Sequence, residues 1–369
     1  MAPEILANPG RRARPARTTP VDPIAFHRRL PDYAATPLVA APVLAAELGL
    51  AELRVKVESS RLGLPAFKML GASWATYRVL VERLGAEPAW ASVDELRRAL
   101  APLGTLSLTA ATDGNHGRAV ARMARLLGYG AHIFVPAGTV AARIDGIASE
   151  GAVVTVVDGS YDDAVAASAQ EARDDVLVIS DTSWEGYTQV PSWVIEGYST
   201  IAAEVDEQLD GARPDIVVVQ MGVGALAAAM VEHFATDAAL VAVEPLRAAC
   251  GLRSAEAGHP VEVPGPHDSI MAGLNCGTVS VVAWPTVAAG IDVFVAVDDG
   301  AAERAMRDLA SIDVVAGETG AAGLAGLRAL VESGSSPVDL AGCSALVICT
   351  EGATDPDAYS RIVSSSGAR

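Results

Sequence analysis

Lysine is almost missing from this chain of 369 residues. Its 27 lysine and arginine residues include only two lysines, Lys56 and Lys68. Arginine stays protonated at any ordinary pH, whereas a lysine in an apolar pocket can lose its proton and become a nucleophile, so a reactive amine has only these two positions. Lys68 lies in an apolar, small-residue stretch, FKMLGASWATY. The ordinary alternative is that both lysines are surface residues.

Three further absences exclude classes of function. The formal net charge of −18 leaves no clustered positive charge for a phosphate backbone, so nucleic acid is not an expected partner. No apolar run could span a bilayer, and no apolar core of a signal peptide follows the N-terminal arginines. We therefore expect a cytoplasmic protein without a membrane partner, with a flexible tail at residues 1–20. We expect no metal and reduced thiols, because no CxxC pair or zinc-site histidine accompanies the four cysteines, Cys250, Cys276, Cys343 and Cys349.

Short apolar runs alternate with alanine-rich helical stretches from about residue 104 onward. The segments TLSLTAA, AHIFVPA and AVVTVVD are separated by helical patterns, and the rhythm resumes with LVISD, DIVVVQ, LVAVEP, DVFVAV and ALVICTEG. This βαβ pattern predicts an α/β fold with parallel sheets between helices. Because such units occur before and after about residue 160, we expect two sheets with a ligand-binding cleft between them.

A glycine-rich turn joins a strand pattern to a helix pattern in VVVQMGVGALAAAMVEHF. Backbone N–H groups at such a helix N-terminus favour an anion. Gly222, Gly224 and Ala227 satisfy G-x-G-x-x-A, and Glu244 follows about 20 residues later, where a dinucleotide ribose would bind. The turn therefore indicates a phosphate group of either a nicotinamide dinucleotide or another phosphate ester, with a purely structural turn as the third possibility.

Polar side chains gather in three other turns. TAATDGNHGRAVA places Asp113, Asn115 and His116 at the start of a helix, where helix capping is the structural alternative. DTSWEGY and CTEGATDP carry acidic and hydroxyl groups just beyond strand ends, the edge where α/β sheets bind ligands. The chain thus combines one lysine in a small-residue segment with two turns that could bind phosphate and with these carboxylates. Together they favour an aldehyde cofactor held as a lysine imine, and pyridoxal 5'-phosphate fits that description.

Nine ordered segments resemble the fold-type II pyridoxal-phosphate enzymes and, within them, the diaminopropionate ammonia-lyase family. They are ATPL, KVESSRLGLPAFKMLGAS, ATDGNHGRAVA, DTSWEGYTQVPSWVIEGYSTI, GVGALAAA, VEPLRAAC, SIMAGLNCGTVS, GETGAAGLAGL and TEGATDP. The resemblance implies a tryptophan synthase β-like α/β fold of two three-layer domains, with the cofactor in the cleft between them. It places residues 21–72 and 161–369 in a large cofactor-binding domain and residues 73–160 in a small one. Relatives of this kind are usually homodimers.

The resemblance also assigns the residues that would hold the cofactor. Lys68 is the imine lysine and Asn115 meets the 3-hydroxyl, while Thr350 faces the pyridine nitrogen. A neutral hydroxyl at this position leaves the ring nitrogen largely unprotonated, which suits β-elimination. The phosphate loop consists of Gly222, Val223 and Gly224.

Two carboxylates are implied to act on the substrate. Asp113 stands where related dehydratases carry a small hydroxyl residue, and it could take the Cα proton of a D-amino acid while Lys68 serves the L-isomer. Asp181 would bind the distal ammonium of the substrate. The expected reaction is elimination of ammonia from D- or L-2,3-diaminopropionate through an aminoacrylate, with hydrolysis to pyruvate and a second ammonia.

Three alternatives stay open at this point. A serine or threonine dehydratase-like lyase, or a specialised-pathway relative acting on another β-substituted amino acid, would keep the same catalytic frame, and Val57 and Leu62 depart from the usual family pattern. An NAD-dependent oxidoreductase would use Gly222, Gly224 and Glu244. An inert relative that binds a cofactor or a partner protein would show no turnover.

Overall fold

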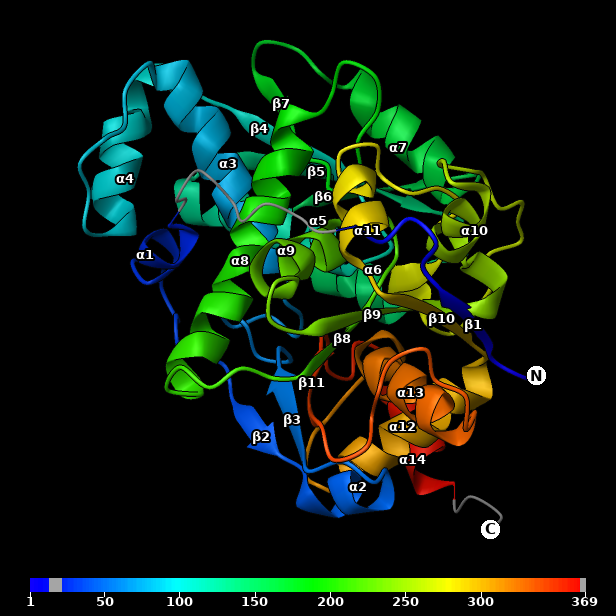
Figure 1. The fold of residues 1–369 in the computed structure, drawn as a ribbon. Coiled ribbons are helices and arrows are strands. Elements are labelled where there is room, and N and C mark those ends of the chain that lie inside the picture. Colours follow the sequence, from blue (N-terminus) through cyan, green and yellow to red (C-terminus); the bar gives the residue numbers. More distant parts are fainter. Residues whose placement is uncertain (13–21, 366–369) are drawn as a thin grey trace. The chain divides into compact units, whose positions relative to one another are not determined.

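The chain folds into two compact units, each with its own sheet (Figure 1). The computed structural model describes residues 1–12 and 22–365. The first unit comprises Met1–Pro20, Ala35–Ser60 and Ile201–Arg369, and the second comprises Val21–Ala34 and Arg61–Thr200. The boundaries expected from the sequence lie elsewhere, after residues 72 and 160. The short strand at Val176–Val178 pairs with the strand at Ser107–Ala111, so the sheet of the second unit continues beyond residue 160.

A seven-stranded sheet forms the centre of the first unit. Its strand order is β1-β10-β9-β8-β11-β3-β2, and the five inner strands run parallel. The inner strands are continuous apolar runs because helices cover both faces of a parallel sheet. The strands are β1 (Glu4–Ala7), β2 (Leu38–Ala40), β3 (Glu52–Val57), β8 (Ile216–Gln220), β9 (Ala239–Pro245), β10 (Val293–Val297) and β11 (Ser344–Cys349).

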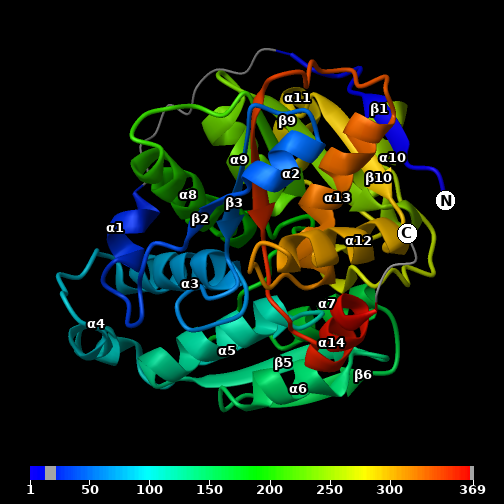
Figure 2. The same ribbon diagram turned by 90° about the horizontal axis from the view of Figure 1, so that it is seen from below.

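Helices on this sheet complete three layers. Helix α13 packs against strands β8 to β11 with α12 beside it, as Figure 2 shows, and α9 packs on β8 and β9 together with α11. The helices of this unit are α2 (Pro42–Glu47), α9 (Ala225–Phe234), α10 (Cys250–Ala257), α11 (Trp284–Gly290), α12 (Asp299–Ala310), α13 (Glu318–Glu332) and α14 (Pro356–Ser364).

Strand β1 corrects the expectation of a flexible tail over residues 1–20. Glu4–Ala7 pairs antiparallel with Ala296–Val293 at the edge of the sheet. Asn8 then donates hydrogen bonds to the carbonyls of Ala288 and Ile291. These long-range contacts, from the backbone of β1 and the side-chain amide of Asn8, order residues 4–8. The part of the expected tail at residues 13–20 lies outside the described residues.

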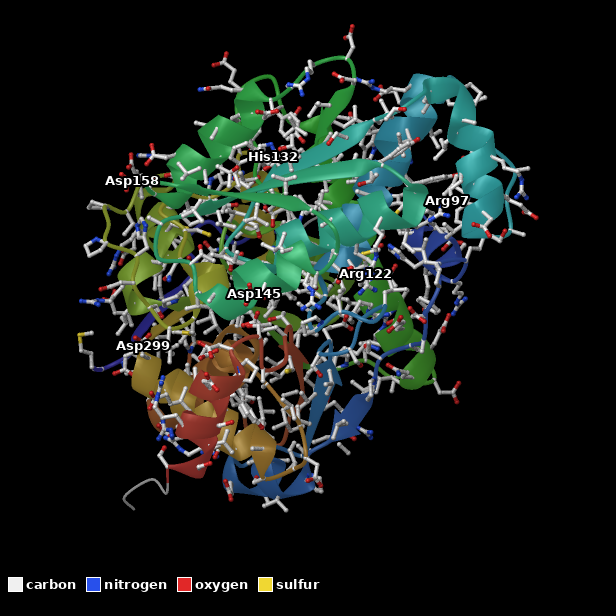
Figure 3. The ribbon with its side chains drawn as sticks, turned by 180° about the vertical axis from the view of Figure 1, so that it is seen from behind. Arg97, Arg122, His132, Asp145, Asp158 and Asp299 are labelled. Atoms are coloured by element: carbon white, nitrogen blue, oxygen red, sulfur yellow. The ribbon has the colours of Figure 1, made fainter. Side chains whose placement is uncertain are left out.

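The second unit contains a four-stranded parallel sheet in the order β6-β5-β4-β7. The chain runs from β4 through α5, β5 and α6 to β6, then back through α7 to β7. Right-handed crossovers therefore place α5 and α6 on one face and α7 on the other, as Figure 3 shows around His132 on β5, Arg122 on α5 and Asp145 on α6. The elements are β4 (Ser107–Ala111), α5 (Asn115–Leu127), β5 (Gly130–Pro136), α6 (Ala141–Ala148), β6 (Val153–Val157), α7 (Tyr161–Gln170) and β7 (Val176–Val178).

Four further helices begin in the second unit: α1 (Pro23–His27), α3 (Lys68–Leu84), α4 (Val93–Leu100) and α8 (Gln189–Gln208). Helix α3 packs on α5, and the aromatic ring of Phe26 in α1 stacks on Tyr77 of α3 with ring centroids 4.7 Å apart. The predicted α/β fold is thus confirmed. Within the described residues, no helix has the length and apolar character that crossing a bilayer requires.

Candidate active site

Lys68 is the first residue of α3, and small residues after it let α3 approach α8 closely. A Cβ atom on Gly71 would lie 2.6 Å from Cε1 of Tyr198 and 2.7 Å from Cγ1 of Val194, so only glycine fits between the two helices. Tyr198 is fully buried. The small-residue pattern around Lys68 therefore reflects a tight helix crossing that fixes the start of α3.

The amine of Lys68 is paired with the carboxylate of Asp181. Lys68 Nζ lies 2.6 Å from Asp181 Oδ2, and the two side chains are 19% and 7% exposed. Burial opposes charge on Lys68, but the carboxylate of Asp181 raises the pKa of the amine above its ordinary value. Burial also opposes ionisation of Asp181, yet the Lys68 ammonium and the hydrogen bond that it donates hold the pKa of the carboxyl below its ordinary value. The pair is therefore an ammonium and a carboxylate.

His116 lies on the other side of Asp181. Its Nε2 donates to the carbonyl oxygen of Ile179 at 2.7 Å, and its Nδ1 lies 3.8 Å from Asp181 Oδ2. Burial lowers the pKa of His116, so the ring is neutral with Nδ1 unprotonated. Nδ1 is buried and has no hydrogen-bond partner among the described residues. The sequence placed His116 only at the start of a helix, because its pairing with the segment after β7 depends on tertiary structure.

Tyr187 fixes the segment that carries Asp181. Its hydroxyl donates to the carbonyl oxygen of Val178 at 2.7 Å and accepts from the N–H of Ser180 at 3.1 Å. Burial raises the pKa of Tyr187 above its ordinary value, which keeps the hydroxyl neutral and able to donate. Trp184 stacks on the Tyr187 ring with centroids 4.2 Å apart. These contacts hold Asp181 at a fixed distance from the end of β7.

Asp113 and Asn115 belong to the turn between β4 and α5. Asn115 is the first residue of α5 and is half-buried, while Asp113 lies two residues before it. The guanidinium of Arg143, on α6, donates to the Asp113 carbonyl oxygen at 3.3 Å and lies 3.7 Å from Asp113 Oδ2. Arg143 is a neighbour that the sequence did not indicate. The negative charge of Asp113 also contributes to raising the pKa of Lys68.

The predicted phosphate loop joins β8 to α9 in the first unit. Gly224 has φ of +102°, a conformation that side chains rarely adopt, and a Cβ on Gly222 would lie 3.1 Å from the sulfur of Cys276 and 3.2 Å from the carbonyl oxygen of Gly273. The N–H groups in the first turn of α9 have no intrahelical acceptor. The carbonyl of Val223 accepts from the N–H of Ser280 at 2.9 Å and holds the loop in place. Backbone N–H groups of this kind can bind an anion.

Thr350 follows β11 in the same unit and is buried. Its hydroxyl oxygen accepts a hydrogen bond from Gln220 Nε2 at 2.6 Å. Gln220 is the last residue of β8, next to the phosphate loop. The sequence indicated Thr350 through its family motif, but nothing in the local pattern indicated Gln220.

Glu244 overturns the nicotinamide alternative. Its two carboxylate oxygens accept from the N–H groups of Gly251 and Leu252 at 2.7 and 2.8 Å, at the start of α10, and the side chain is fully buried. Burial raises the pKa of Glu244 to about 7. A carboxyl group engaged in this way cannot bind a ribose, so the G-x-G-x-x-A match was misleading.

Lys56, the other lysine, is also buried, contrary to the surface alternative. Its Nζ donates to Glu204 Oε2 at 2.7 Å, to the Thr36 carbonyl oxygen at 2.8 Å and to Gln208 Oε1 at 2.9 Å. These partners all belong to the first unit. Lys56 is a structural ion pair between β3 and α8.

The chain is similar to known proteins along most of its length. A family model described as pyridoxal-phosphate dependent enzyme matches residues 30–342. The diaminopropionate ammonia-lyase of Escherichia coli strain K12 is 37% identical over 360 residues, covering 92% of this chain and 89% of that enzyme. The biosynthetic L-threonine dehydratase of Mycobacterium leprae is 34% identical over 241 residues, covering 62% of this chain and 54% of that enzyme.

A solved structure is similar to this chain over nearly its full length. The diaminopropionate ammonia lyase of Escherichia coli, crystallised in complex with D-serine, matches with a TM-score of 0.88 and 33% identity. The match covers 98% of this chain and 96% of that one. Both the sequence and the fold therefore align over nearly their full lengths.

Proposed function

Because the chain belongs to the pyridoxal-phosphate dependent enzyme family, we propose that it is a lyase that eliminates ammonia from 2,3-diaminopropionate, with pyruvate and two ammonia as final products. The similarity to diaminopropionate ammonia-lyases over 92% of the chain supports this substrate. The resemblance further implies a homodimer in the cytoplasm.

The residues present fit pyridoxal 5'-phosphate. The positive φ of Gly224 and the close contacts of Gly222 favour a glycine loop whose amides bind phosphate. Lys68 supplies the amine for the aldehyde, and Asn115 and Thr350 would bind the 3-hydroxyl and the ring nitrogen. When bound, the cofactor provides the electron sink that stabilises negative charge at the substrate α-carbon.

The contact between Lys68 and Asp181 is the observation that favours diaminopropionate over serine and threonine as the substrate. It shows a buried carboxylate that binds an ammonium group at 2.6 Å. With Lys68 engaged by the cofactor, Asp181 would be available to bind another cation. Diaminopropionate has a distal ammonium to place there, whereas serine and threonine have only a hydroxyl. A charge-assisted hydrogen bond of this kind favours diaminopropionate.

Proton transfer at the α-carbon is assigned to two residues. Lys68, when released as a free amine, would take the proton of the L-isomer. Asp113 would take the proton of the D-isomer, and the guanidinium of Arg143 holds its carboxylate in position from 3.7 Å.

Turnover with a substrate panel tests the proposal. Purified protein supplied with pyridoxal 5'-phosphate should release pyruvate from D- or L-diaminopropionate faster than from serine, and should release little oxobutyrate from threonine. Faster turnover of serine or threonine would favour the dehydratase alternative. Absence of any turnover would favour an inert relative.

Chemical trapping tests the lysine separately. Borohydride reduction followed by peptide mapping should place the label on Lys68, and Lys56, the only other lysine of the chain, is the internal control. Lys68→Arg keeps the positive charge beside Asp181 but should lose both the visible absorbance and the activity. A label on Lys56, or none at all, would overturn the assignment.

A further inference from the structure

Gln220 and Thr350 meet at the ends of two neighbouring parallel strands. Strand β11 pairs with β8, so the residues that end these strands reach the same edge of the sheet. Both side chains are almost fully buried, at 3% and 1% exposure. Neither is an apolar core residue. Gln220 Nε2 and Thr350 Oγ1 have hydrogen-bond partners, whereas Gln220 Oε1 is buried without one among the described residues.

Backbone carbonyls fix which way the Gln220 amide faces. Gln220 Nε2 lies 2.9 Å from the carbonyl oxygen of Thr319 and 3.4 Å from that of Gly320, in the first turn of α13. A carbonyl oxygen can only accept, so the atom that faces these two must be the amide nitrogen. The flipped amide would set its oxygen against two others.

This orientation decides the role of the Thr350 hydroxyl. The same Nε2 lies 2.6 Å from Thr350 Oγ1. An amide nitrogen only donates, so the hydroxyl oxygen is the acceptor of this bond and its hydrogen must point elsewhere. Among the described residues no acceptor for that hydrogen is found. The hydroxyl is therefore left to donate to a group outside the protein.

We propose that Gln220 is a positioning residue that acts through Thr350: it makes the hydroxyl a hydrogen-bond donor toward the bound cofactor. This inference rests on the proposed function, in which Thr350 meets the pyridine nitrogen. A donated hydrogen bond requires a nitrogen with a free lone pair, so Gln220 keeps that nitrogen unprotonated. Without Gln220, the hydroxyl can turn and accept instead, and protonation of the ring nitrogen is no longer opposed.

A double-mutant cycle on the holoenzyme tests the coupling. Gln220→Met keeps the side-chain length but removes the donor, and Thr350→Val removes the hydroxyl. The readouts are the dissociation constant of pyridoxal 5'-phosphate and the pH midpoint of the visible absorbance. Gln220→Met should shift the pH midpoint and weaken cofactor binding about five- to tenfold. When Val occupies position 350, the same change should weaken binding less than about twofold and leave the pH midpoint where it was.

The controls separate positioning from general damage to the fold. In a Thr350→Ser background, which keeps the hydroxyl, the effect of Gln220→Met should return. Equal effects of Gln220→Met with Thr, Ser and Val at position 350 would overturn the proposal, because they would indicate a structural role only. An unchanged pH midpoint in the wild-type background would also overturn it.

Neutron diffraction from the wild-type chain in heavy water needs no variant. The deuterium on Thr350 Oγ1 should point away from Gln220, and the Gln220 nitrogen should carry deuterium toward Thr319 and Thr350. A flipped amide, or a hydroxyl that donates to Gln220, would contradict the inference even if trapping labels Lys68. If borohydride trapping instead fails to label Lys68, the proposed function is refuted, while the neutron result still reports the orientation of the Gln220 amide and the Thr350 hydroxyl.

Discussion

Replacing Asp181 by Asn should speed the uptake of pyridoxal 5'-phosphate by the apoprotein. The carboxylate lies 2.6 Å from Lys68 Nζ, and its charge raises the pKa of the amine. Only the neutral amine attacks an aldehyde. Asp181→Asn keeps the shape of the side chain but removes the charge, so a larger fraction of Lys68 is neutral at a given pH.

The distance sets the size of the effect. Two unit charges this close attract by about 6 kcal/mol at an effective dielectric constant of about 20. If only a quarter of that attraction is expressed in the pKa of Lys68, the pKa falls by about one unit, because one unit corresponds to about 1.4 kcal/mol. The neutral fraction, and with it the rate of uptake, should then rise at least about tenfold near neutral pH.

Stopped-flow absorbance provides the assay. The rise of visible absorbance after mixing apoprotein with cofactor is followed between about pH 6 and pH 9 for wild type, Asp181→Asn and Asp174→Asn. Asp174 is exposed and serves as the matched control. Uptake by Asp181→Asn that is no faster than wild type at any pH, or an equal acceleration in Asp174→Asn, would refute the electrostatic argument.

The remaining predictions concern the substrate, the helix crossing and the buried carboxyl. Asp181→Asn should raise the KM for diaminopropionate about tenfold or more, and an unchanged KM would count against its role. Asp113→Asn should suppress turnover of the D-isomer much more than that of the L-isomer; equal loss would contradict its assignment. Gly71→Ala should lower the melting temperature, with a cost of about 1–3 kcal/mol, because its Cβ would lie 2.6 Å from Tyr198, whereas Gly300→Ala on α12 should have little effect. The pKa of Glu244 is raised from 4.5 to about 7, so the unfolded state loses its proton first and stability falls as pH rises between these values, by at most about 1.4 kcal/mol per pH unit. Denaturant titrations should show a flatter pH dependence in Glu244→Gln.

Strands buried on both faces were predictable from the sequence because their residues form unbroken apolar runs. Ile216–Gln220 is an example, and the glycine turn after it could be placed at a strand end for the same reason. Strand β1 was not predictable. It has only four residues at a sheet edge, and its pairing with β10 joins parts of the chain almost 300 residues apart. No local pattern encodes such a contact.

Side chains that act through hydrogen bonds were harder to predict than the residues of the family motifs. Lys68, Asp113 and Asp181 could be named because they lie in motifs with a known chemistry. Arg143 contacts Asp113 through the packing of α6, and Gln220 contacts Thr350 through the pairing of β8 with β11. Their roles depend on which atom faces which neighbour, and a sequence does not state that.

The two lysines show why burial alone does not identify a reactive amine. Both are held against a carboxylate, at 2.7 Å for Lys56 and 2.6 Å for Lys68. Lys56 also donates to two other acceptors, so a neutral or modified Lys56 would leave buried oxygens without a donor. Lys68 donates to Asp181, and the hydroxyl of Tyr198 is a further neighbour of its amine. Under the proposed function, a substrate ammonium would replace the Lys68 ammonium beside Asp181, so Lys68 is the lysine that we expect to leave its ion pair and react.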